Sequence, residues 1–128
     1  MKKVAEVTEL KEGGFVIIDG EPSRIVSIQT SKTGKHGSAK ARIEAMGIFD
    51  NQRRSIVKPV DAKIDVPLIE KKSAQVVAFL GDKVQFMDLN TYEIFEAPFP
   101  EELKEKLAAG VEVEYLEALG RRKILRTK

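Results

Sequence analysis

A lysine at position 35 lies between two glycines in a stretch rich in hydroxyl groups and positive charge. Residues 29–40 read Gln-Thr-Ser-Lys-Thr-Gly-Lys-His-Gly-Ser-Ala-Lys and contain a single aliphatic side chain. Gly34 and Gly37 bracket Lys35-His36, and glycine adopts positive φ without the steric penalty of a Cβ. Small and hydroxyl-bearing residues between two apolar segments indicate an exposed loop. We therefore predict a hairpin tip with Lys35 at its apex.

The charge around this loop is one-sided. No acidic residue lies between Glu21 and Glu44, whereas five cations do: Arg24, Lys32, Lys35, Lys40 and Arg42. The whole chain carries a net charge of only +2. Its first 68 residues hold 12 Lys/Arg against 9 Asp/Glu, and the remainder hold 10 against 11. Because the positive excess is local, we expect the loop to face an anionic partner, although the protein as a whole is not strongly basic.

Two other interpretations of the loop start from its composition. Loops of Lys, Gly and Ser are commonly solvated connections with no further role. A phosphate-binding P-loop would need Gly six positions before Lys35 and Ser or Thr directly after it, because its backbone amides and hydroxyl hold phosphate and Mg²⁺. Those positions are Gln29 and His36, so the P-loop is excluded.

The composition offers few parts for catalysis. The 128 residues include one histidine, His36, and no cysteine, so imidazole dyads, cysteine nucleophiles and thiolate zinc sites lack their components. We predict no catalytic residue, no metal site and no bound cofactor. No apolar window approaches the roughly 20 residues that span a bilayer, and Met1–Glu6 lacks the apolar core of a signal peptide. We expect a cytoplasmic protein that does not associate with membranes.

Short apolar runs separated by turn residues predict strands throughout residues 1–68. Asp19-Gly20 is the pair preferred in tight type I′ hairpin turns, and Pro59 and Pro67 restrict their strands to edges or ends. The expected strands are 4–7, 15–18, 24–28, 41–49, 55–58 and 62–66. Their number and length favour a small, partly open barrel. The pattern changes near Leu68, where we place the boundary between domains 1–68 and 69–128.

The second half shows three strands, a helix and two strands. The strands are predicted at 74–80, 84–89, 92–96, 111–115 and 123–126. Pro100 suits the first position of a helix and Gly110 its end, while Leu103 and Leu107 would form its buried stripe. This order is that of the OB-fold, a five-stranded barrel. The fold class is therefore all-β: two small barrels, the second an OB-fold with one helix.

The run Thr30–Lys40 resembles the hypusine loop of the translation initiation factor 5A family, relatives of bacterial elongation factor P. The similarity continues through Asp65-Val66-Pro67 and covers the whole chain, whose length is similar to that of the archaeal members. In the family, the lysine between Gly and His-Gly receives an aminobutyl group from spermidine, and here that residue is Lys35. The resemblance also implies an SH3-like first domain carrying the loop at 29–40.

What the resemblance implies about function is a ribosome-binding factor that is not an enzyme. Modified Lys35 would brace peptidyl-tRNA and promote peptide-bond formation, chiefly in elongation through poor sequences such as polyproline, with initiation and termination as further steps. Deoxyhypusine synthase would be the modifying enzyme, and we expect a monomer in solution. The loop motif comprises Ser31, Lys32, Thr33, Gly34, His36, Gly37, Ser38 and Lys40. Lys32, Lys40 and Arg42 are expected to contact RNA phosphates.

One position departs from the family pattern. Eukaryotic members usually have His where this chain has Ser38. This departure puts hydroxylation of the added arm in question, so the final form at Lys35 is left open between deoxyhypusine and hypusine. The competing hypothesis is an RNA-binding or RNA-chaperone module that uses the OB-fold with an unmodified loop. An enzyme of unknown type is a third, weaker hypothesis.

Overall fold

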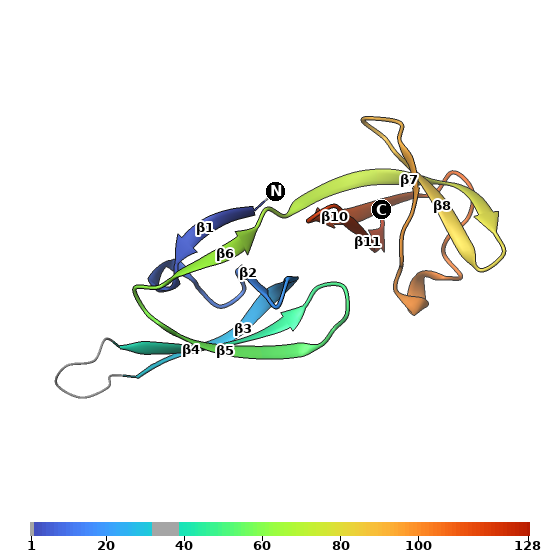
Figure 1. The fold of residues 1–128 in the computed structure, drawn as a ribbon. Coiled ribbons are helices and arrows are strands. Elements are labelled where there is room, and N and C mark those ends of the chain that lie inside the picture. Colours follow the sequence, from blue (N-terminus) through green and yellow to red (C-terminus); the bar gives the residue numbers. More distant parts are fainter. Residues whose placement is uncertain (1, 32–38) are drawn as a thin grey trace. The chain divides into compact units, whose positions relative to one another are not determined.

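The computed structural model describes residues 2–31 and 39–128, which form eleven β-strands and two short 3-10 helices (Figure 1). The chain divides into two compact units, Met1–Leu68 (unit 1) and Ile69–Lys128 (unit 2). Within the described residues, no helix has the length and apolar character needed to cross a bilayer. The all-β fold class predicted from the sequence is confirmed.

Unit 1 consists of a four-stranded antiparallel sheet and a separate two-stranded ladder (Figure 1). The sheet order is β2-β3-β4-β5, and β1 pairs with β6. The strands are β1 (Lys2–Glu6), β2 (Phe15–Ile18), β3 (Glu21–Ser31), β4 (Lys40–Gly47), β5 (Arg53–Pro59) and β6 (Lys63–Pro67). A 3-10 turn, η1 (Val7–Glu9), follows β1. This is the small, SH3-like barrel expected from the sequence.

The core of unit 1 is aliphatic and follows from alternation along the strands. On β4, Ala41, Ile43 and Ala45 are buried, while the residues between them point the other way. The remaining buried members of this cluster are Val7, Val16, Ile18, Ile25 and Ile64. The β2–β3 turn has φ of 53° at Asp19 and 76° at Gly20. Both angles are positive, as a type I′ turn requires, and the predicted hairpin is confirmed.

Unit 2 is one five-stranded antiparallel sheet in the order β11-β10-β7-β8-β9. Its strands are β7 (Glu70–Leu80), β8 (Lys83–Asp88), β9 (Ile94–Glu96), β10 (Glu112–Ala118) and β11 (Arg121–Thr127). β9 and β11 are the edge strands of this sheet. The segment that follows β9 contacts β11, where the Ile124 amide donates to the Pro98 carbonyl over 2.9 Å. Three strands, an intervening segment and two strands closed in this way form the predicted OB-fold.

Aromatic rings fill the centre of this barrel. The Phe95 ring lies 6.0 Å from Phe86 and 4.8 Å from Tyr115, centroid to centroid. The buried Tyr115 hydroxyl donates to the Asp88 carboxylate over 2.5 Å. The other oxygen of Asp88 accepts the amides of Asn90 and Thr91, at 2.7 and 2.8 Å. Thus the one carboxylate that is fully buried in unit 2 is hydrogen-bonded on both oxygens.

The helix predicted after Pro100 is reduced to a single 3-10 turn, η2 (Glu101–Leu103), followed by turns. Pro100 itself is extended, with ψ of 140°, and fewer than ten residues separate it from Gly110, below the length at which helices persist unaided. Burial of Leu103 and Leu107 instead fixes the segment. The Gly110 amide then donates to the carbonyl of Val76 on β7, which ends the excursion.

Candidate functional site: the base of the β3–β4 connection

The β3–β4 ladder continues beyond the core of unit 1 toward the predicted functional loop. Its last pairs are Gln29–Arg42, Thr30–Ala41 and Ser31–Lys40. Ser31 and Lys40 are therefore the last pair of the ladder, and residues 32–39 connect them. Seven predicted site residues lie outside the described residues: Lys32, Thr33, Gly34, Lys35, His36, Gly37 and Ser38.

A third strand braces this base on one side. β5 runs beside β4 with Pro59 opposite Lys40, and the Val60 amide donates to the Ala39 carbonyl over 2.9 Å. On the other side, β2 pairs only with the beginning of β3, as far as Arg24. Among the described strands, the outer part of β3 thus pairs only with β4. β5 supports this part of the ladder indirectly, because it pairs with the other side of β4.

Register places four of the cations of this sheet on one face, whereas Arg54 and Lys58 of β5 lie opposite the buried Ala45 and Ala41. Residues opposite each other in a ladder point the same way, and Lys40, Arg42 and Glu44 alternate on β4 with the buried positions. Arg53 on β5 and Arg24 on β3 both lie opposite Met46, the next residue on that face. The face therefore carries four cations and one carboxylate: Arg24, Lys40, Arg42, Arg53 and Glu44. We call it the basic face.

Glu44 occupies the middle of the basic face. Its carboxylate lies 3.3 Å from the Arg42 guanidinium and 3.7 Å from that of Arg53, and it accepts a hydrogen bond from Ser27 at 3.4 Å. The two arginine side chains are 58% and 60% exposed. Exposed ion pairs contribute little net free energy because water solvates both charges well, so both guanidinium groups can exchange Glu44 for another anion.

The other two cations of the basic face are placed differently. Lys40 is exposed and has no carboxylate partner within the described residues. The Arg24 guanidinium lies over the Phe15 ring, 5.2 Å from its centroid, a cation–π contact that holds the side chain along the face. Of the predicted phosphate contacts, Lys40 and Arg42 are thus brought together near the loop base, two positions apart on one strand.

Two residues of the basic face were not predicted from the sequence. Arg53 lies beyond the acid-free window, on a strand separated from β4 by a turn. Glu44 marked the end of that window but was not expected to join two arginines. The period-two pattern of β4 is visible in the sequence, but the register between β4 and β5, which places Arg53 near Glu44, is not.

Unit 2 offers a poorer surface for nucleic acid. Phe86, Phe95 and Tyr115, which could stack on bases, are buried. Arg122 is engaged by Glu93 at 2.8 Å and Glu117 at 3.0 Å, and it lies over the Phe95 ring. The exposed aromatic rings of this unit, Phe79 and Tyr92, are not accompanied by a basic face like that of unit 1.

An ionic network links three strands of unit 2. Glu117 lies 2.7 Å from the Lys72 ammonium and 3.0 Å from the Arg122 guanidinium. The hydrogen bond from Lys72 is the main reason that the pKa of Glu117 lies below its usual value, and burial opposes it. Among the described residues, no group of three His, Cys, Asp or Glu side chains is arranged to hold a metal ion.

Comparisons with known proteins cover the whole length. The family model described as "Translation initiation factor 5A-like, N-terminal" matches residues 3–62, and "Eukaryotic elongation factor 5A hypusine, DNA-binding OB fold" matches residues 68–128. A translation initiation factor 5A from Methanothermobacter thermautotrophicus is 66% identical, with 99% of this chain and 98% of the relative covered. One from Pyrococcus furiosus is 56% identical, at 99% and 95% coverage.

A solved structure is similar as well. The eukaryotic translation initiation factor 5A from Methanococcus jannaschii has a TM-score of 0.89 and 49% identity, with 99% of this chain and 95% of that chain covered. A family protein from Naegleria fowleri has a TM-score of 0.79 and 31% identity, at 99% and 98% coverage.

Proposed function

Because this chain belongs to the translation initiation factor 5A family, we propose that it binds the ribosome and promotes peptide-bond formation by presenting a modified Lys35 to peptidyl-tRNA. Elongation through poor sequences such as polyproline is the main task, and initiation and termination are further steps it could serve. The observation that carries the proposal is the closed pair Ser31–Lys40 at the end of a braced ladder, beside the basic face.

The chemistry of Lys35 suits this role. A lysine stem is long and unbranched, and its ammonium is a compact charge that pairs with RNA phosphates. An aminobutyl group from spermidine, added by deoxyhypusine synthase, would lengthen the side chain and add a second amine. With Ser38 in place of the usual eukaryotic His, deoxyhypusine is the proposed final form. The other loop residues, from Ser31 and Lys32 to Lys40, would be recognised by the modifying enzyme and by RNA.

The basic face would position the factor without reading sequence. Phosphate contacts fix register and orientation on a nucleic acid, and Lys40 and Arg42 are exposed near the loop base. Lys32 is proposed as a third contact. Holding peptidyl-tRNA in a reactive pose lowers the entropic part of the barrier, and this matters most for poor substrates such as consecutive prolines. The factor itself would then need no catalytic residue, metal or bound cofactor, and would act as a cytoplasmic monomer.

The alternative, an RNA-binding or RNA-chaperone module that uses the OB-fold with an unmodified loop, is supported by the OB fold that the second family description names. Unit 2 gives this alternative little support, because its central aromatic residues are buried and Arg122 is already paired with Glu93. Fold alone does not assign function, since one fold serves many sites.

The test is a reconstituted translation assay with a polyproline reporter and the factor purified from its native cell. Lys35→Arg keeps the charge but blocks the modification, and should abolish stimulation of the reporter. Lys11→Arg, the same change at an exposed lysine of unit 1, is the matched control and should retain it. Full stimulation by the Lys35→Arg variant would contradict the proposal and favour the nucleic-acid-binding module.

A further inference from the structure

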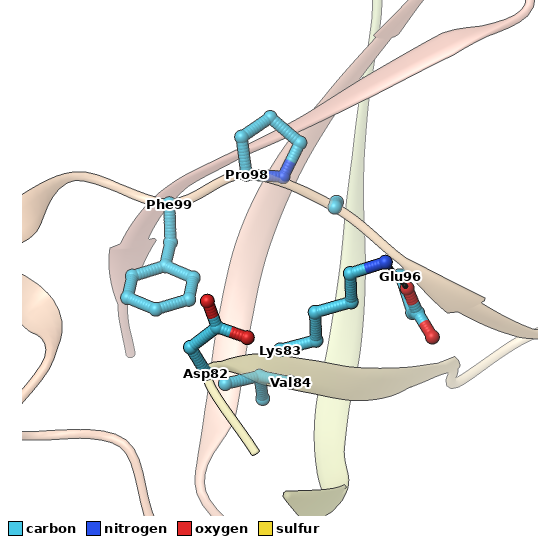
Figure 2. Close-up of a pocket in the computed structure, with 7 residues that line it drawn as sticks. Asp82, Lys83, Val84, Glu96, Pro98 and Phe99 are labelled. Carbon is cyan, nitrogen blue, oxygen red and sulfur yellow. Dashed lines mark ion pairs between the residues drawn. The ribbon is translucent and has the colours of Figure 1, made fainter. Parts of the chain in front are cut away.

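Unit 2 has a hollow of about 300 Å³ between the start of β8 and the segment that follows β9 (Figure 2). Val84, Ala97, Pro98 and Phe99 form apolar walls. Asp82, Lys83 and Glu96 supply the polar groups of its rim. The volume is at the lower end for ligand sites, so the hollow suits one long side chain better than a nucleotide or a large cofactor.

The walls are held by the barrel rather than by the hollow itself. Ala97 and Phe99 pack against the core of unit 2, and the Pro98 carbonyl accepts the hydrogen bond from Ile124 on β11. The opposite wall begins at a tight turn, where Gly81 has φ of 65° and Leu80 pairs with Lys83. The cavity is therefore preformed and needs little rearrangement to bind a ligand.

Exposed apolar side chains lie on the β7–β8 hairpin, whose second strand supplies one wall of the hollow. Phe79 and Leu80 lie opposite Val84 and Lys83 in the β7–β8 ladder, and they are 48% and 51% exposed. Successive residues of a strand point to opposite faces, so Phe79 shares its face with Val84, a wall residue of the hollow, whereas Leu80 shares its face with Lys83 at the rim.

The charges at the rim favour a positively charged ligand. Figure 2 shows the Asp82 carboxylate turned toward Phe99, and Asp82 has no ion-pair partner among the described residues. Glu96 is paired with Lys83 at 3.9 Å, with side chains 45% and 70% exposed. Such a long, exposed pair is weak, so Lys83 can move away and leave a second carboxylate for an incoming cation. Both carboxylates would repel phosphate.

We propose that this hollow binds an arginine side chain from a basic, extended segment of a protein partner. The guanidinium would stack on the Phe99 ring and form an ion pair with the Asp82 carboxylate. The methylene groups of the arginine would pack on Val84 and Pro98. Glu96 would exchange Lys83 for the same guanidinium. An apolar residue beside the arginine would cover Phe79, which lies opposite Val84 in the ladder. This binding site is formed entirely by residues of unit 2 and does not depend on the proposed function.

The test is an NMR titration of the ¹⁵N-labelled full chain with the capped peptide Gly-Ser-Leu-Arg-Leu-Ser-Gly. The matched probe replaces arginine by citrulline, which keeps the shape and removes the charge. We expect the amide signals of Asp82, Val84, Ala97 and Phe99 to shift with the arginine peptide only. Asp82→Asn, an exposed change that should leave the rest of the spectrum unchanged, is expected to weaken binding about fivefold.

Two further variants sharpen the test. Glu96→Gln should also weaken binding, because it removes the second carboxylate. Glu102→Gln, an exposed acid elsewhere in unit 2, should have no effect. The proposal is overturned if the citrulline peptide binds equally, if shifts avoid the hollow, or if Asp82→Asn binds normally. The same spectra are recorded with a uridine oligonucleotide and with spermidine. The proposal is also overturned if either of them shifts the signals of these residues while the arginine peptide does not.

Discussion

The Tyr115 hydroxyl and the Asp88 carboxylate are joined by a buried hydrogen bond of 2.5 Å that connects β10 to the end of β8. The same carboxylate caps the turn that leads to β9 through the amides of Asn90 and Thr91. One side chain thus ties a central strand of unit 2 to the hairpin that completes the sheet. Stability of this unit should depend strongly on this pair.

Removing the hydroxyl tests the pair directly. Tyr115→Phe leaves one oxygen of a buried carboxylate without its donor, and we expect it to lower the free energy of unfolding by about 1–3 kcal/mol. Tyr92→Phe removes a hydroxyl from a ring that is 69% exposed and serves as the control, with an expected change below about 0.5 kcal/mol. Urea unfolding followed by circular dichroism measures both. Equal losses of unfolding free energy in the two variants would show that the buried hydrogen bond does not contribute more to stability than an exposed hydroxyl.

Asp88 also predicts how stability depends on pH. Burial alone would raise its pKa, but hydrogen bonds from Tyr115, Thr91 and Asn90 outweigh burial and lower the pKa to about 2, from an ordinary value of 3.8. A carboxyl with a lower pKa in the folded state stabilises the protein above its unfolded pKa. That contribution, about 2 kcal/mol, is lost as pH falls from roughly 4 to 2.

The matched variant for this pH effect is Asp88→Asn. It should be less stable at neutral pH and should lose less stability than the parent chain as the pH falls through the same window. The two tyrosines of the chain, Tyr92 and Tyr115, both belong to unit 2 and there is no tryptophan, so tyrosine fluorescence during urea unfolding reports this unit. Parallel pH profiles for the two proteins would mean that other carboxyls account for acid sensitivity.

The segment after Pro100 should respond to loss of burial more than to loss of helix propensity. Leu107 is 6% exposed, and Leu107→Ala should cost about 2–5 kcal/mol because it leaves a cavity. Glu105→Gly, at an exposed neighbouring position, would cost about 1 kcal/mol in a true helix interior and is expected to cost less here. A loss of about 1 kcal/mol or more for Glu105→Gly would contradict this expectation and indicate a true helix.

The success and failure of sequence prediction have clear physical causes. Strands with period-two burial, such as β4, and the Asp19-Gly20 turn follow from local rules, and both were predicted. The helix failed because Leu103 and Leu107 have helical spacing but are buried by tertiary contacts in a turn. The third strand of unit 2 was predicted from Tyr92 but begins at Ile94, because Tyr92 has a positive φ of 62° within the turn capped by Asp88.

The candidate site was only partly predictable for a related reason. The cations near the loop were evident from the sequence, because they are local. The association of Glu44 with Arg53, and of Arg24 with Phe15, depends on which strands pair and in which register. Register is a property of the folded sheet, and a one-residue slip would move these side chains to the opposite face.

The affinity of the basic face for RNA should depend on the number of positive side chains available to contact phosphates. Arg42→Ala is expected to weaken binding of a tRNA uniformly across sequences and to reduce the slope of log K against log salt by about one. Lys104→Ala, at an exposed lysine of unit 2, is the control. Filter binding across a salt series measures the slope. An unchanged slope for Arg42→Ala would remove this residue from the interface.

Glu44→Gln should act in the opposite direction. It removes the carboxylate shared by Arg42 and Arg53, and we expect tRNA affinity to rise about twofold with little change in stability. The same salt series provides the measurement. Weaker binding by this variant would instead mean that Glu44 orients the two arginines for the contact.

We propose that Lys35 carries an aminobutyl group in the cell. Intact and peptide mass spectrometry of the chain purified from its native cell tests this most directly. We predict an increment of one aminobutyl group located on Lys35, with no added oxygen, as expected with Ser38 at its position. An unmodified Lys35 in that preparation would contradict the account, and function would then have to rest on the charge of the loop and the basic face alone.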